Sequence, residues 1–263
     1  MRGSVIVLAS GPSTQDFPVQ EFSTVPIITM NGAISHLLDT AIRPLFYVCT
    51  DRGFPREQPE LYQAALARAD NLALWPDEIA RLAPEQKAIA YPLRKAPTTG
   101  FKHLLGHDRD RATRSRNILS KRSRSIGFSK DMSYGFFDAR TVAYVCLQLA
   151  YHLGFDKVFM VGVDLNGSAQ RFYDDRIGKR SPCGLNDYFD VRILPSFRVL
   201  KRAFDGTGRQ VLNLSTHSRL PTSVVERADL QTLRKSLVHQ HVAGLDPAAR
   251  ASASNCSSMK SGE

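Results

Sequence analysis

Short apolar runs recur along the chain, and several are followed at once by small or polar residues. The runs are four to six residues long and almost continuously apolar, as expected of strands covered on both faces. They occupy residues 4–9, 26–30, 45–50, 71–75, 88–91, 157–162 and 210–214. Strands of this kind are typical of a parallel sheet between two layers of helices.

Apolar positions at helical spacing predict the helices between these strands. The strongest pattern covers residues 136–153, which places Asp138 in the first turn of the helix and Gly154 at its end. Further helices are predicted over residues 57–68, 77–82, 195–204 and 222–238. The order of elements predicts an α/β fold, with a Rossmann-like, mostly parallel sheet and helices on both faces.

Three segments interrupt this pattern because they have little periodicity. Residues 92–127 are predicted to be an inserted loop or lid, and the polar and aromatic residues 167–190 a second loop at the site. Residues 243–263 are rich in Ala, Ser and Gly, which predicts a disordered tail. We expect residues 1–242, including the insert, to form a single domain.

The net charge of +10 is concentrated in the insert. Residues 91–130 contain eleven Lys or Arg and two Asp, which is +9 from one segment and leaves +1 for the rest of the chain. Such a surface fits an anionic membrane face, a phosphorylated glycolipid or nucleic acid, and a solvated mobile loop is the plain alternative. The residues that we assign to contact with an acceptor or membrane are Arg114, Arg116, Lys121, Arg122 and Arg124.

Composition and cysteine spacing favour a cytoplasmic protein. Apolar residues make up 43% of the chain, but no run approaches the roughly 18 that span a bilayer. The chain begins almost directly in a strand, without room for a signal peptide. The four cysteines are scattered, without the spacing of a metal site, so we expect reduced thiols.

Small and polar residues at the ends of three early strands suggest a binding crevice. Ser10 and Gly11 follow the first strand, Asn31 the second and Asp51 the third. The carboxyl ends of parallel strands meet at one edge of a sheet, where open α/β sheets bind ligands. Taken singly, each residue is better explained as a cap or turn residue than as a ligand contact, so the prediction depends on their coincidence.

Several of these stretches together resemble the bacterial sialyltransferase-like superfamily. The resembling residues are VIVLASGPS at the start, Asn31, Asp51, the MSYG turn with its helix, and VGVDLNGS after the strand at 157–162. That superfamily includes transferases that use CMP-sialic acid and relatives of the pterin pyrophosphokinases. Within it, residues 126–166 are most similar to transferases that add an extra Kdo sugar to the lipopolysaccharide inner core.

The resemblance implies a GT-A-like sialyltransferase variant that binds a CMP-sugar, with Kdo or otherwise sialic acid as the sugar. It covers residues 1–50 and 128–218, and the basic insert lies outside it. The nucleotide-sugar contacts that it implies are Gly11, Ser13, Asn31, Ser133, Gly135, Asp164, Asn166 and Tyr173. The implied acceptor is lipopolysaccharide core or another anionic glycolipid, reached by a peripheral enzyme on the cytoplasmic face of the inner membrane.

The general base departs from the superfamily pattern. Its sialyltransferases use a histidine in the second loop, whereas this chain has none between His152 and His217. A loose alignment places Asp190 near that point, so Asp190 and His217 are both candidates to accept the proton of the acceptor hydroxyl. Asp51 is a third catalytic candidate. Asp190 as a loop cap and His217 as a turn residue are the alternatives.

No metal or other cofactor is expected. Hydroxyl, amide and backbone N–H groups of the strand ends can stabilise a leaving phosphate. Asp108 and Asp110 have D-x-D spacing but lie among arginines, so we interpret them as a chance match. A pterin-type pyrophosphokinase using ATP and Mg²⁺, a non-enzymatic protein that binds anionic surfaces and an inactive transferase stay open. The few aromatic residues of the insert argue against nucleic acid.

Overall fold

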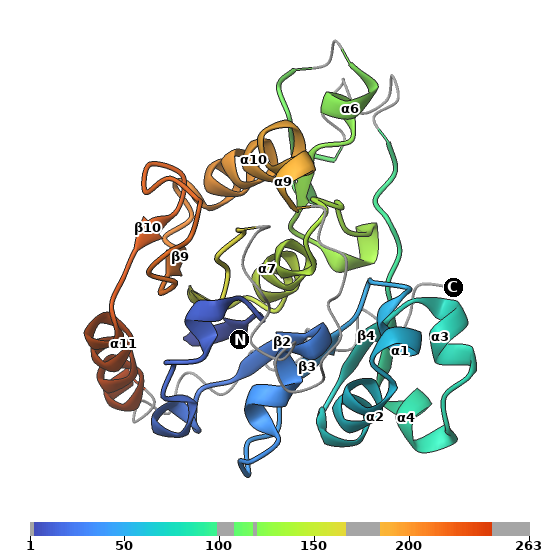
Figure 1. Cartoon of the computed structure of the whole chain (residues 1–263). Coiled ribbons are helices and arrows are strands. Elements are labelled where there is room, and N and C mark those ends of the chain that lie inside the picture. Colours follow the sequence, from blue (N-terminus) through green and yellow to red (C-terminus); the bar gives the residue numbers. More distant parts are fainter. Residues whose placement is uncertain (1–2, 99–107, 118–119, 167–184, 244–263) are drawn as a thin grey trace.

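A parallel sheet forms the centre of the molecule. The structure is a computed structural model that describes residues 3–98, 108–117, 120–166 and 185–243. Its eight-stranded sheet has the order β10-β9-β8-β1-β2-β3-β4-β5, and every neighbouring pair is parallel (Figure 1). The strands are β1 (Ser4–Leu8), β2 (Ile27–Met30), β3 (Phe46–Val48), β4 (Leu72–Leu74), β5 (Ala90–Pro92), β8 (Lys157–Val161), β9 (Gln210–Asn213) and β10 (Glu226–Arg227). The predicted Rossmann-like sheet is confirmed.

The chain extends the sheet in two directions from β1. β1 pairs with β2 on one side, where Ile6 lies opposite Ile27, and with β8 on the other, where Ser4 lies opposite Lys157. Strands β2 to β5 follow on the first side, and β9 and β10 on the second. The carboxyl ends of β1 and β8 therefore flank a topological switch point, where sheets of this kind bind ligands.

Side chains of β1 alternate between two apolar cores, one on each face of the sheet. Val5 and Val7 belong to one core and Ile6 and Leu8 to the other. The first core includes α7 (Val142–His152) and α10 (Leu194–Phe204), and the second includes η3 (Asn31–Leu37), α2 (Pro59–Arg68) and α11 (Leu230–Ala243). Burial on both faces explains why the strand sequences are continuously apolar rather than alternating.

The insert contains regular structure in the part that is described. β6 (Ala112–Arg114) pairs antiparallel with β7 (Gly127–Ser129), and α6 (Lys121–Arg124) lies between them in sequence. The two strands pack against α10, and α6 projects away from the sheet (Figure 1). The expectation of an irregular loop is wrong here, since elements of three or four residues are too short to show a period.

The main departure from the sequence prediction is the start of α7. The helix was expected from residue 136 but begins at Val142, with Thr141 as its N-cap residue. Phe136 instead forms a parallel bridge with Lys95. This pairing joins segments distant in sequence, which helical periodicity does not detect. Asp138 therefore precedes the helix and is not in its first turn.

Two other regions also differ from the prediction. Residues 185–190, expected to be part of a loop, lie in helix α9 (Leu185–Tyr188) and at the start of a π-helical turn, η5 (Phe189–Ile193). The closing helix begins at Leu230 and not at residue 222, because β10 occupies residues 226–227. The remaining short elements are η1 (Pro12–Thr14), η2 (Val19–Phe22), α1 (Phe54–Glu57), α3 (Pro76–Ala80), α4 (Pro84–Ala88) and η4 (Met132–Tyr134).

A buried glutamine fixes α7 to the segment before it. The Oε1 atom of Gln148 accepts the N–H groups of Ser129 and Phe137, both at 2.9 Å. Its Nε2 atom donates to the carbonyls of Phe137 and Tyr144, both at 3.0 Å. A buried polar side chain with all of these bonds made holds the backbone of Phe137 against α7.

No helix in the described ranges has both the length and the apolar character needed to cross a bilayer. The predicted tail begins at residue 243, but Ala243 is the last residue of α11, and residues 244–263 lie outside those ranges.

Candidate active site at the carboxyl edge of the sheet

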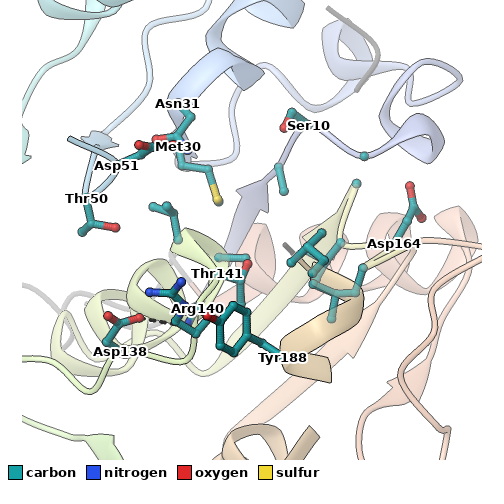
Figure 2. A pocket seen from close by; sticks show the side chains of 18 of the residues that line it. Ser10, Met30, Asn31, Thr50, Asp51, Asp138, Arg140, Thr141, Asp164 and Tyr188 are labelled. Carbon is teal, nitrogen blue, oxygen red and sulfur yellow. Dashed lines mark hydrogen bonds between the residues drawn. The ribbon is translucent and has the colours of Figure 1, made fainter. Parts of the chain in front are cut away.

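A pocket of about 480 Å³ opens at the switch point. The ends of β1, β2, β3 and β8 line it together with the segment that leads into α7 (Figure 2). Its polar lining residues include Ser10, Asn31, Thr50, Asp51, Arg52, Lys95, Asp138, Arg140, Thr141, Asp164, Asn166 and Tyr188. The volume and the convergence of polar groups suit a small-molecule ligand.

Five of the residues that we predicted for the site line this pocket: Gly11, Asn31, Asp51, Asp164 and Asn166. They follow four strands that are distant in sequence, and the parallel order of those strands brings them together. The amide of Asn166 also donates to the carbonyl of His217 at 3.0 Å, which ties the β8 turn to the turn after β9. Contact of the five with a nucleotide-sugar stays a prediction.

The turns after β1 and β8 are locked to each other. Ser13 donates through its N–H and its hydroxyl to the Asp164 carboxylate, at 2.9 and 2.7 Å. The Gly11 N–H donates to the carbonyl of Gly162 at 2.9 Å. A Cβ on Gly11 would collide with Asp164, and one on Gly162 with Thr14, so both positions need glycine. Asp164 thus lines the pocket and holds the turn after β1 in place, whereas Ser13 does not line the pocket.

Asn31 lines the pocket and has a buried side-chain oxygen without a hydrogen bond to a described residue. Asn31 is 9% exposed, and its Oδ1 atom has no hydrogen-bond partner among the described residues. An unpaired buried polar atom is unfavourable by about 1–3 kcal/mol.

Strained backbone gathers at the same pocket. In the described part of the chain, three residues other than glycine have a left-handed backbone: Asn31 (φ 43°), Arg140 (φ 64°) and Leu165 (φ 58°). All three line the pocket. Each costs on the order of 1 kcal/mol, and strain of this kind is concentrated at functional sites in proteins.

An aromatic ring that the sequence analysis did not single out supports the end of β3. Trp75 donates through its indole N–H to the carbonyl of Thr50 at 3.1 Å. The guanidinium of Arg52 lies 4.9 Å from the centre of the Trp75 ring and pairs with Asp77 at 2.7 Å. Arg52 is therefore a pocket cation whose charge is already matched.

The segment before α7 forms the opposite wall, and the sequence analysis missed its role. Asp138 accepts the Arg140 N–H at 2.8 Å and the Lys95 ammonium at 2.9 Å. Burial acts to raise the pKa of Asp138, but these two donors outweigh it, so the pKa lies below its usual value. The sequence signal for this wall is Thr141, a residue type that favours the N-cap, directly before the apolar stripe.

Ser133 and Gly135, which were expected at the nucleotide, do not line the pocket. The Ser133 hydroxyl donates to the Asp131 carboxylate at 2.6 Å and accepts from Arg111 at 2.9 Å. Gly135 has φ 104° and packs on the backbone of residues 94–96, where a Cβ would collide. In this structure both residues anchor the insert, because α7 begins well after the MSYG turn.

The three candidate bases differ in position. Asp51 lines the pocket. Asp190 lies outside the lining, with its side chain 75% exposed and 3.6 Å from Arg219. His217 is also outside the lining and is exposed. Geometry therefore favours Asp51 among the three. Tyr173, predicted to contact the nucleotide-sugar, lies outside the described residues.

The five basic residues assigned to the acceptor fall into two groups. Arg114 is internal: its side chain is 12% exposed, pairs with Asp108 at 3.0 Å and donates to the Tyr134 hydroxyl at 2.6 Å. The other four, Arg116, Lys121, Arg122 and Arg124, are exposed. Asp108 is engaged in this buried pair. Among the described residues, no group of three or more His, Cys, Asp or Glu is placed to hold a metal ion.

Residues 98–228 match the family model of the 3-deoxy-D-manno-octulosonic acid transferase WaaZ. The chain is 28% identical over 240 residues to a probable 3-deoxy-manno-octulosonic acid transferase of Escherichia coli K12, covering 87% of this chain and 83% of that protein. It is 25% identical over 248 residues to a probable transferase of the same description from Salmonella typhimurium LT2, covering 90% and 91%.

Solved structures give more distant likenesses. One is the sialyltransferase CstII of Campylobacter jejuni in complex with cytidine-5'-monophosphate, with a TM-score of 0.43 and 13% identity over 86% of this chain and 85% of that chain. Another is the MAf glycosyltransferase of Magnetospirillum magneticum AMB-1, with a TM-score of 0.45 and 15% identity over 89% and 36%. The sequence matches are the stronger result, and the matched range includes the basic insert, which the motif resemblance had left out. Over residues 98–228 the chain is therefore similar to the family of the 3-deoxy-D-manno-octulosonic acid transferase WaaZ.

Proposed function

We propose that this protein is a glycosyltransferase that moves Kdo from CMP-Kdo to the core of lipopolysaccharide. The observation that carries the proposal is the pocket at the switch point, in a chain whose residues 98–228 match the WaaZ family. The locked turns after β1 and β8 and the unpaired Asn31 face one cavity, which suits recognition of a phosphorylated nucleoside.

Asp51 is the proposed general base. Its Oδ1 atom is held by the Gly53 N–H at 2.9 Å, which orients the carboxylate at the pocket. The carboxylate accepts the proton of the acceptor hydroxyl while that oxygen bonds to the anomeric carbon of Kdo. The bond from that carbon to the phosphate oxygen breaks, and CMP leaves with the electron pair. Polar side chains and N–H groups of the pocket stabilise the leaving phosphate, so we expect no metal requirement and full activity with EDTA.

The exposed cations of the insert are the proposed contact with the acceptor and with the cytoplasmic face of the inner membrane. Arg116, Lys121, Arg122 and Arg124 lie on a segment that projects from the sheet (Figure 1). Each basic residue near an anionic bilayer contributes on the order of 1 kcal/mol. Binding to anionic vesicles that weakens as salt rises is the measurement that checks this contact.

The test of the function is transfer itself. We would incubate the purified chain with CMP-Kdo and a lipopolysaccharide core acceptor, and measure the mass of the acceptor by mass spectrometry. We expect the mass to rise by one Kdo, with one CMP released for each sugar transferred. Turnover of ATP with Mg²⁺ on a pterin substrate, without Kdo transfer, would support the pyrophosphokinase alternative instead.

A further inference from the structure

Arg140 is an arginine in an unusually constrained position at the pocket wall. Its backbone is left-handed, with φ 64°. Its N–H donates to Oδ1 of Asp138 at 2.8 Å, and Oδ2 of that carboxylate accepts the Lys95 ammonium at 2.9 Å. The Asp138 carboxylate therefore fixes the backbone of Arg140 and is paired with the Lys95 ammonium.

No acid among the described residues forms an ion pair with the guanidinium of Arg140. It lies 4.3 Å from the centre of the Tyr188 ring, which restricts it by stacking. Two other cations line the described part of the pocket, and both are paired: Arg52 with Asp77 at 2.7 Å, and Lys95 with Asp138. Within the described residues, Arg140 is thus the pocket cation with no carboxylate in an ion pair with it.

A stacked, unpaired guanidinium is suited to bind a planar anion. Its N–H groups form a rigid fork that matches a carboxylate with two parallel hydrogen bonds. The Tyr188 ring already restricts the Arg140 side chain before a ligand binds, so less rotamer entropy is lost on binding. The strained backbone is consistent with a side chain whose position is needed for function.

The donor in the proposed function carries two anions, which the pocket can separate. One is the phosphate that links the nucleoside to the sugar. The other is the carboxylate of Kdo, which is attached to the anomeric carbon. Figure 2 shows Asn31 and Ser10 on one wall of the pocket and Arg140 with Tyr188 on the other. We propose that Arg140 binds the carboxylate of the donor sugar and so selects an acidic sugar over a neutral one. This inference rests on the proposed function.

The experiment compares two non-hydrolysable analogues of CMP-Kdo, one with the carboxylate and one with a carboxamide in its place, together with CMP. Calorimetric titration gives the affinity of each for the wild-type chain and for R140N, R140K and R52Q. Asparagine tolerates the left-handed backbone, so R140N removes the charge with little strain. R140K keeps the charge but loses the fork.

Wild type should bind the carboxylate analogue about 10- to 100-fold more tightly than the carboxamide. R140N should bind the two alike while its affinity for CMP stays that of wild type, and R140K should keep part of the preference. R52Q is the matched control, because Arg52 is also a stacked pocket arginine but is paired, and its preference should equal that of wild type.

Two results would overturn the inference while leaving the proposed function intact. One is a wild-type chain that binds both analogues equally. The other is an R140N chain that loses affinity for CMP as much as for the carboxylate analogue, which would assign Arg140 to the phosphate. A folded wild-type chain that binds neither CMP nor the analogues would overturn the proposed function and this inference with it.

Discussion

At the scale of single residues, the pocket contains two carboxylates that serve mainly to hold backbone. Asp164 receives both of its bonds from Ser13, and Asp138 receives the Arg140 N–H and the Lys95 ammonium. Charge-assisted bonds of this kind contribute about 1.5–3 kcal/mol when they are shielded from water. Both acids therefore determine where their neighbours lie.

The low pKa of Asp138 gives a pH-dependent prediction for D138N. Because the pKa is lower in the folded state, the carboxylate stabilises the fold above its unfolded pKa of about 3.9, and this contribution is lost as pH falls through the folded pKa. We expect D138N to lower the free energy of unfolding by about 1–2 kcal/mol at neutral pH, with the difference shrinking below about pH 4. Urea denaturation of both chains across this pH range measures it.

D190N is the control for that comparison. The Asp190 side chain is 75% exposed, and its ion pair with Arg219 is long, at 3.6 Å. Removing the Asp190 charge should therefore change the free energy of unfolding little at any pH. A D138N difference that persists unchanged into strong acid would show that the charge of Asp138 is not what stabilises the fold.

At the scale of elements, one arginine joins three parts of the molecule. Arg192, in the π-helical turn η5, donates to the Asp138 carbonyl through Nε and a terminal nitrogen, at 2.8 and 2.5 Å. It also donates to the Ser125 hydroxyl at 2.5 Å and to the carbonyls of Ser125 and Arg122 at 3.1 and 3.3 Å. The end of the insert helix is thereby connected to the pocket wall before α7. Single turns of π-helix are frequent at functional sites.

Replacing this arginine should loosen both segments together. We expect R192Q to lower the free energy of unfolding by about 1–3 kcal/mol and to increase amide hydrogen exchange in residues 121–125 and 136–141. R202Q removes a single bond, from Arg202 to the Arg114 carbonyl at 3.1 Å, and should leave exchange in 136–141 unchanged. Faster exchange in only one of the two segments would contradict the coupling.

Element prediction succeeded where the apolar runs are long and failed where distant segments pair. Strands β1 and β8 are near their predicted limits because continuous apolar sequence is sufficient evidence for a buried strand. Residues 136–141 look helical because Phe136 and Phe137 extend the stripe of α7, yet the Lys95–Phe136 bridge keeps Phe136 out of a helix. No local pattern contains that pairing, and the same error hid Arg140.

At the scale of the whole molecule, the sheet order decides which polar strand ends meet. The sequence placed Asn31, Asp51 and Asp164 at one edge, since all carboxyl ends of a parallel sheet share it. It did not show that β8 lies beside β1, which creates the switch point. It also did not separate Ser133 from the pocket, because that depends on how the insert packs.

Charge on the insert gives a whole-molecule prediction for membrane binding. The triple variant R116Q/K121Q/R122Q should bind anionic vesicles about 100-fold more weakly than wild type at low salt, since each cation contributes on the order of 1 kcal/mol. R56Q/R81Q/K87Q, which removes three exposed cations from the helices α1 and α4 and the end of α3, is the matched control and should bind like wild type. Sedimentation with vesicles measures both, and equal losses in the two variants would point to net charge alone.

The most direct measurement of the central claim is Kdo transfer from CMP-Kdo to lipopolysaccharide core by wild type, N31G and D51N. Glycine suits the left-handed backbone at residue 31, so N31G removes the amide without adding strain. We predict one Kdo added per acceptor by wild type, and rates at least about 100-fold lower for both folded variants. A folded wild-type chain that transfers no Kdo, or variants as active as wild type, would contradict the assignment of this pocket as the active site.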